Sequence, residues 1–290
     1  MHALTRRQFL GTAATTAVGS LLPVGTMVAR DKPVLFGLVT YLWGEKWDLP
    51  TLLKNCEASG LLGVELRTTH AHGVEPSLDA SQRAEVKQRF ADSPVTLLGL
   101  GSNENFDSPD PAVVATAIRT VKDFLQLSHD VGGSGVKVKP NDFHPEIPRE
   151  KTLEQIGKSL REVAVFADEL GQEVRMEVHG GCAHLPDMQA IAAHADHPRA
   201  RLCWNSNSED LEDEGLEHNF GLVRPHFGQT LHVHELGDPK YPYERLAALL
   251  VESAYPGWVL LEASSKPADP VAAMAEQRAL WEIALAKAPR

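Results

Sequence analysis

The stretch that decides the fold is Val174–Gly181, which reads VRMEVHGG. It is a short apolar run that finishes in Glu177 and is then broken by a pair of glycines. Three later runs also carry polar, ligand-type residues at the end of an apolar segment: LCWNSNS (202–208), LHVHELGD (231–238) and WVLLEASS (258–265). In a barrel of parallel strands, the carboxyl ends of all the strands meet on one face. We therefore expect the polar ends of these four runs to converge.

The rest of the chain repeats a unit of one strand and one helix. Apolar runs rich in Val and Leu begin at eight places, 27 to 40 residues apart: near Val34, Gly63, Val95, Gly135, Glu173, Ala200, Leu231 and Trp258. Such near-continuous runs are typical of parallel strands covered on both faces. Helix-like sequence separates them, as in Leu153 to Leu170, where apolar residues recur at three- and four-residue spacing. Residues 30–290 are therefore predicted to form a single (β/α)8 TIM barrel. The alternative, an open doubly wound sheet, lacks a GxGxxG motif after its first strand.

Residues 1–29 have the character of an export signal. The pair Arg6-Arg7, followed by Phe-Leu, precedes an apolar stretch that contains no acidic residue and ends near Ala29. The twin arginine resembles a Tat leader, so we expect contact with the Tat translocon during export and a periplasmic or extracellular protein. The apolar stretch is too interrupted for a stable membrane span. A frayed helix with a chance arginine pair is the alternative.

The charge of the chain excludes several classes of partner. Lys and Arg total 28 against 39 Asp and Glu, which gives a net charge of −11. Removal of residues 1–29 takes away two arginines and leaves 26 against 39, or −13. An acidic surface of this kind argues against binding to nucleic acid or to anionic membranes. The three cysteines are widely spaced and predict neither disulfides nor a structural zinc site. The sequence leaves the oligomeric state open, and an oligomer is possible.

The four strand ends together offer the donor atoms of a metal site. Strand side chains alternate between two faces, so Glu177 shares a face with His179, and His232 shares one with His234. Carboxylates from Glu177 and Glu262, with an amide and an imidazole, suit a divalent cation such as Mn, Mg, Co or Zn.

Glu, Asn, His-x-His and Glu on consecutive strand ends resemble the pattern of the xylose-isomerase-like TIM-barrel superfamily, which includes sugar isomerases, 3-epimerases and inosose dehydratases. The resemblance covers roughly Val34 to Ala288 and is best over MEVHGG, HVHELGD and YPYERLAALLVESAYPGWVLLEAS. It implies that Glu177, His234 and Glu262 ligate a divalent metal.

Asn205 departs from the family pattern, which usually has aspartate at that position. The amide oxygen of Asn205 can still bind a hard cation, so Asn205 is the fourth predicted ligand. The alternative is that this change has released the metal and left a sugar-binding protein without catalytic activity.

Five other side chains are candidates for contact with a substrate. Trp43 could form an apolar wall, and Glu104, His179 and His232 could contact a sugar. In VKVK (136–139) both lysines should point to the same side of the sheet, where a lysine needs an anionic partner. Lys139, the one nearer the mouth, is expected to have a catalytic role by binding a substrate oxygen or the site carboxylates.

The resulting expectation is a metal-dependent isomerase or epimerase acting on a small-molecule sugar or keto-sugar through an enediolate. Glu177 and Glu262 would transfer the proton next to the carbonyl group, because they come from different arcs of the ring. A metal-dependent lyase or dehydratase acting on a 3-keto-glycoside or inosose-like substrate is the second possibility, and a sugar-binding protein is the third.

Overall fold

The computed structural model describes residues 34–289, and the expected export signal lies outside them. Residues 34–289 all lie within one compact unit. Among residues 34–289, no helix combines the length and the apolar character needed to cross a membrane.

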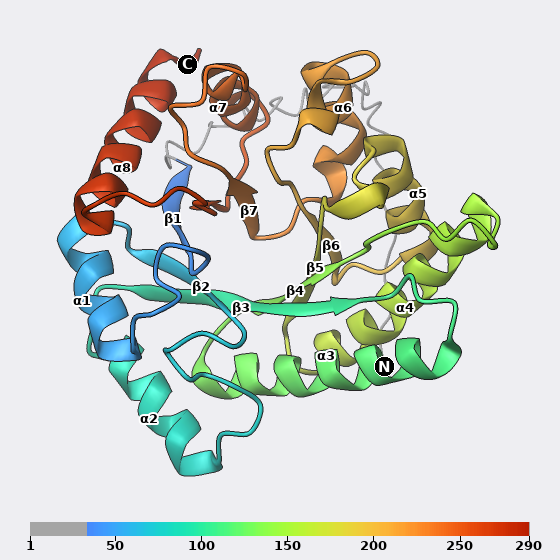
Figure 1. Cartoon of the computed structure of the whole chain (residues 1–290), viewed down its shortest axis with the longest axis horizontal. Coiled ribbons are helices and arrows are strands. Elements are labelled where there is room, and N and C mark those ends of the chain that lie inside the picture. The colour runs from blue at the N-terminus through green and yellow to red at the C-terminus, as the bar shows by residue number, and fades with distance from the viewer. Residues whose placement is uncertain (1–33, 290) are drawn as a thin grey trace, which may run out of the picture. The chain divides into compact units, whose positions relative to one another are not determined.

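In the part of the chain that is described, eight parallel strands form the barrel (Figure 1). They are β1 (Leu35–Val39), β2 (Gly63–Arg67), β3 (Thr96–Asn105), β4 (Gly135–Lys139), β5 (Glu173–Glu177), β6 (Ala200–Cys203), β7 (Thr230–Val233) and β8 (Trp258–Leu261). Paired strands run in the order β6-β5-β4-β3-β2-β1-β8-β7. Between β6 and β7, the backbone N–H of His232 donates to the carbonyl of Trp204 at 2.7 Å, so the barrel is nearly closed. The predicted (β/α)8 TIM barrel is confirmed.

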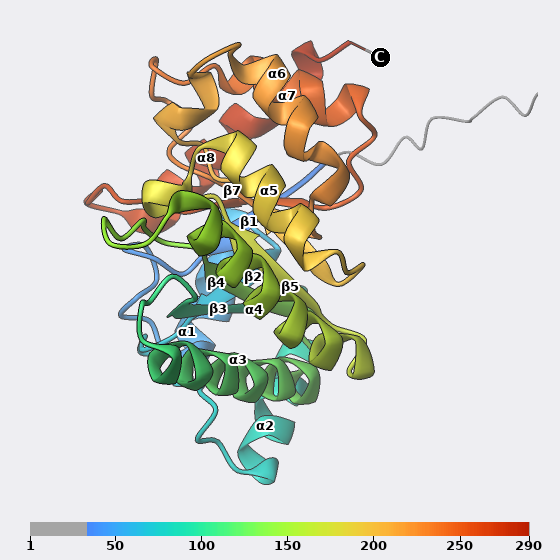
Figure 2. The same cartoon turned by 90° about the vertical axis from the view of Figure 1, so that its right-hand side faces the viewer.

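Eight α-helices alternate with the strands within residues 34–289. They are α1 (Leu49–Ser59), α2 (Ala80–Ala91), α3 (Pro111–Val131), α4 (Arg149–Glu169), α5 (Leu185–Ala195), α6 (Leu216–Val223), α7 (Tyr243–Glu252) and α8 (Pro270–Lys287). Figure 2 shows α3, α4 and α5 as neighbours on the outside of the strands. Aspartate side chains cap α1, α2, α3 and α8 by accepting backbone N–H groups of the first turn.

Arg175 is buried in the amino-terminal half of the barrel interior. Its guanidinium is fully buried, lies 3.0 Å from Glu173 Oε2, and donates to the carbonyl of Leu98 and the hydroxyl of Ser134. Gly99 makes room for it, because a Cβ there would lie 3.0 Å from Arg175 Nη1. Buried and hydrogen-bonded groups thus fill this end of the interior, and in barrels of this kind the site lies at the carboxyl end.

Candidate metal centre

Three potential ligands converge at the carboxyl end of the barrel. Glu177 is the last residue of β5, His232 lies within β7, and Glu262 directly follows β8. One donor atom from each lies within 4.8 Å of the others, and all three side chains are buried. His232 Nδ1 is 3.4 Å from Glu177 Oε1 and 3.8 Å from Glu262 Oε2. Two carboxylates and an imidazole at this spacing could hold a divalent cation.

Asn205 lies between the two glutamates, as expected from its place after β6. Its Nδ2 donates to Glu177 Oε1 at 2.9 Å and to Glu262 Oε2 at 3.2 Å. Its Oδ1 is buried and has no hydrogen-bond partner among the described residues. Rotation of the amide group by half a turn exchanges its nitrogen and oxygen. The oxygen would then face the space between Glu177 and Glu262, where a metal ion would be bound. The side chain therefore suits either a bridging donor or a fourth ligand.

Lys137 supplies a positive charge inside the site. Its Nζ lies 2.9 Å from Glu177 Oε2, with both side chains buried. Burial alone would raise the pKa of Glu177, but Lys137 and His232 outweigh it and hold that pKa well below its usual range. Burial would likewise lower the pKa of Lys137, but Glu177, Glu262 and Glu65 raise it. Lys137 and Glu177 therefore form a buried ion pair, whereas the sequence pointed to Lys139 as the lysine that contacts the site carboxylates.

Glu65 of β2 lies behind the imidazole of His232. Its Oε1 is 3.3 Å from His232 Nε2, and both side chains are 0% exposed. The two atoms face each other without a hydrogen bond in this structure, and the carboxylate on this side leaves the other ring nitrogen for a metal. Nδ1 is the nitrogen that faces Glu177 and Glu262. The alternation of GVELR could have pointed to Glu65 as an inward residue, but no role was predicted for it.

His234 lies outside this group of donors, whereas His232 lies inside it. Strand β7 ends at Val233, so His234 has already left the strand. Its backbone N–H donates to Ser206 Oγ, and its Nδ1 is 3.2 Å from the carbonyl oxygen of Glu262. The structure thus brings together Glu177, Asn205 and Glu262 as predicted, but with His232 in the place expected for His234.

The other candidates lie around the mouth. Lys139 is half-buried at the end of β4, and His179 Nδ1 is 3.1 Å from Asn141 Oδ1. Trp43 is buried, and its Nε1 donates to the carbonyl of Ser265, which joins the loops after β1 and β8. The roles of these side chains in catalysis or substrate binding remain predictions.

Glu104 lies in a separate hollow of about 370 Å³ between the end of β3 and the start of α3. Burial raises the pKa of its carboxyl group. Among the described residues, no hydrogen bond or salt bridge joins Glu104 to Glu177, His232 or Glu262. Contact between Glu104 and a substrate remains a prediction.

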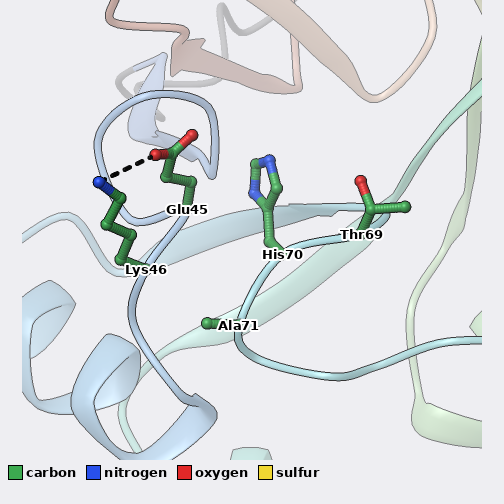
Figure 3. A pocket seen from close by; sticks show the side chains of 5 residues that line it. All are labelled: Glu45, Lys46, Thr69, His70 and Ala71. Atoms are coloured by element: carbon green, nitrogen blue, oxygen red, sulfur yellow. Dashed lines mark ion pairs between the residues drawn. The ribbon is translucent and has the colours of Figure 1, made fainter.

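A larger hollow, of about 590 Å³, opens between the loops that follow β1 and β2. Figure 3 shows His70 between Thr69 and the pair formed by Glu45 and Lys46, whose charged atoms are 3.7 Å apart. Burial, helped by His72, lowers the pKa of His70 to about 4, so its imidazole is neutral at pH 7. The hollow therefore offers polar groups of both charges on the same face of the barrel as the metal centre.

Solved structures share this fold at low sequence identity. D-psicose 3-epimerase from Clostridium cellulolyticum H10, solved with D-tagatose, is 17% identical, with a TM-score of 0.75 over 87% of this chain and 99% of that chain. The 3-keto-D-glucoside 4-epimerase from E. coli is 14% identical, with a TM-score of 0.73 over 86% and 99%. An IolI protein with a bound zinc atom is 15% identical, with a TM-score of 0.73 over 88% and 99%.

Sequence comparison identifies the family. No curated protein shows significant sequence similarity to this chain. The profile of the xylose isomerase-like TIM barrel family matches residues 53–284, which is most of the barrel. The chain therefore belongs to the xylose isomerase-like TIM barrel family.

Proposed function

We propose that this member of the xylose isomerase-like TIM barrel family is a metal-dependent isomerase or epimerase acting on a sugar or keto-sugar. The convergence of Glu177, His232 and Glu262 at the carboxyl end of the barrel carries the proposal. The activities in the names of the similar structures, D-psicose 3-epimerase and 3-keto-D-glucoside 4-epimerase, support the same class of reaction.

The residues present fit a divalent cation. Glu177, His232 and Glu262 would hold it, and the orphaned Oδ1 of Asn205 is the natural fourth donor. We thus assign the histidine ligand to His232 and not to His234. When bound, the cation would act as a Lewis acid that stabilises negative charge on a substrate oxygen by several kcal/mol. Two carboxylates remain as ligands, so the asparagine does not by itself prevent binding.

The two glutamates would transfer the proton. A carboxylate removes the proton from the carbon next to the carbonyl group, and the electron pair of the C–H bond becomes part of an enediolate. Glu177, which is ionised beside Lys137, would first take a proton from solvent and then return it from the opposite face, which inverts that carbon and gives an epimer. Return to the neighbouring carbon by the glutamate that removed the proton gives the aldose–ketose isomer. Glu262, 8% exposed, is closer to solvent than Glu177, which is 1% exposed, so we assign the first step to Glu262.

Turnover in D₂O tests this function. Protein reconstituted with Mn²⁺ is incubated with a panel of aldoses, ketoses and 3-keto-sugars, and we expect an isomeric product with deuterium at the carbon beside the carbonyl. Loss of water or of an aglycone would instead identify a lyase, and stabilisation by sugar without turnover would identify a binding protein. A full yield of isomer without deuterium would exclude proton exchange through solvent-accessible glutamates.

Variants connect the activity to the site. Glu262→Gln should lower turnover by about 10²- to 10⁴-fold, because it removes the proposed base. Glu282→Gln is the matched control, since Glu282 lies on the outer surface of α8 in an exposed pair with Arg278. Glu177→Ala should abolish metal binding, and equal metal content in this variant and the wild type would refute the proposed ligands.

A further inference from the structure

Two cationic side chains, Arg67 and Lys139, lie just beyond the metal centre. Arg67 is two residues after Glu65 on β2, and Lys139 is two residues after Lys137 on β4. Side chains two positions apart on a strand share a face. Arg67 is therefore on the same inward face as Glu65, and Lys139 is on the same inward face as Lys137. β3 separates the two strands: Arg67 is paired with Gly101, and Lys139 is paired with Asn105. The two cations therefore occupy the next inward positions toward the mouth.

Lys139 lies beside the site, because continuation of the register between β4 and β5 puts it level with Glu177. Burial lowers its pKa most, and the positive charges of Lys137 and Arg67 lower it further. The carboxylates of Glu177 and Glu262 act in the opposite direction. The charges of Glu177, Glu262 and Arg67 thus all act on Lys139.

Neither cation has an acidic partner among residues 34–289. No carboxylate oxygen lies within 4.0 Å of Arg67 or Lys139, although Lys137 and Arg175, deeper in the barrel, both have one. Arg67 donates one hydrogen bond to Asn103 Oδ1 at 3.3 Å. Its guanidinium carbon also lies 4.6 Å from the centre of the Tyr41 ring. In a chain with 39 acidic and 28 basic residues, two half-buried cations without a carboxylate are unexpected. An anion from outside the chain would compensate them.

We propose that Arg67 and Lys139 bind an anionic group, a carboxylate or a phosphate, at the end of the sugar substrate. The proposal rests on the proposed function, because the metal centre would hold the carbonyl end of the same molecule. A guanidinium presents a planar fork that matches two oxygens of either anion, and an ammonium adds a point charge. Tyr41 and Asn103 hold the guanidinium in place. The substrate is thus an acidic sugar or a sugar phosphate and not a neutral hexose.

Binding of three ketoses with one carbon skeleton tests the inference. D-fructose, D-fructuronate and D-fructose 6-phosphate are titrated calorimetrically into the Mn²⁺-loaded protein. At least one anionic ketose should bind about 10- to 100-fold more tightly than D-fructose, and its advantage should shrink with added NaCl. Whichever anion binds more tightly identifies the carboxylate or the phosphate as the natural group.

Variants locate the anion. Arg67→Gln and Lys139→Gln should each reduce the ratio of anionic to neutral affinity toward one. Arg119→Gln, which changes an exposed arginine on α3, should keep the wild-type ratio. Inorganic phosphate alone is titrated in parallel, because binding that survives both variants would locate the anion on the metal and overturn the inference.

The inference and the proposed function can fail separately. Equal affinity for all three ketoses, no binding of either anionic ketose, or an anion preference unchanged in both variants would overturn the inference alone. An anion preference that is lost in Arg67→Gln, in a protein that forms no isomeric product from any sugar of the panel, would support the anion site and refute the isomerase function.

Discussion

Replacing Lys137 with methionine tests whether this ammonium is the internal counter-charge of the metal centre. Lys137 Nζ lies 2.9 Å from Glu177 Oε2, and the two side chains are 2% and 1% exposed. Three buried carboxylates, from Glu65, Glu177 and Glu262, share the interior with Lys137 and His232. Methionine is apolar and similar in length, so the change removes mainly the charge. Removal of one partner from a buried pair leaves an uncompensated charge, which typically costs about 3–5 kcal/mol.

A bound cation should reverse most of this loss. The metal supplies positive charge beside Glu177, and loss of the ammonium removes a repulsion that opposes metal binding. A ligand at 100 times its Kd stabilises the folded state by about 2.7 kcal/mol. The variant should therefore be stabilised by Mn²⁺ more than the wild type is, at the same free concentration.

Urea unfolding followed by circular dichroism measures both effects, once in EDTA and once in excess MnCl₂. Lys122→Met is the matched control, because Lys122 of α3 forms an exposed pair with Glu162 of α4 at 2.8 Å. It should change stability little, and equally in both conditions. A Lys137→Met variant that is as stable as the wild type in EDTA, or that gains no more from Mn²⁺, would refute the role as counter-charge.

Three further predictions address other parts of the chain. Asn205→Asp adds a third carboxylate, so it should lower stability in EDTA and tighten Mn²⁺ binding about tenfold, while Asn55→Asp on α1 should do neither. Burial raises the pKa of Asp210 well above 3.8, so its stabilising contribution is complete below that pH and is lost as pH rises through the raised pKa. Asp210→Asn should remove this part of the pH dependence in urea unfolding between pH 4 and 8. We also propose that residues 1–29 direct Tat-type export: Arg6→Lys with Arg7→Lys should retain the full-length protein in the cytoplasm, and an unchanged periplasmic fraction would contradict the assignment.

The fold could be predicted from the sequence because its main signal is local. A parallel strand covered on both faces must be almost continuously apolar, and each of the eight predicted starts lies within one residue of a strand in the structure. The helix predicted from Leu153 begins earlier, at Arg149. Its first turn, Arg149 to Thr152, is mostly polar and therefore contributes little to the apolar periodicity.

The positions of three ligand candidates were also predictable. Glu177, Asn205 and Glu262 each stand at a strand end or within two residues of it, and in a barrel the strand ends converge whatever the details of packing. The histidine was not predictable in this way, because His232 and His234 are two residues apart and would lie on the same face of a strand. The choice depends on where β7 ends, and it ends at Val233, between them.

The lysines show why even the correct register would not have sufficed. In the ladder between β4 and β5, Lys137 is opposite Arg175 and Val138 is opposite Met176, so continuation of that register puts Lys139 level with Glu177. Nevertheless Lys137 reaches Glu177, because its four-carbon chain extends toward the mouth of the barrel. Glu177 is therefore paired with Lys137, which lies deeper in the barrel than Lys139. Lys139 is left without a carboxylate partner among the described residues. Lys137 thus neutralises one of the three buried carboxylates, while Arg67 and Lys139 carry positive charge without a carboxylate partner at the mouth. A substrate with a neutral carbonyl end and an anionic far end would match this separation of charge.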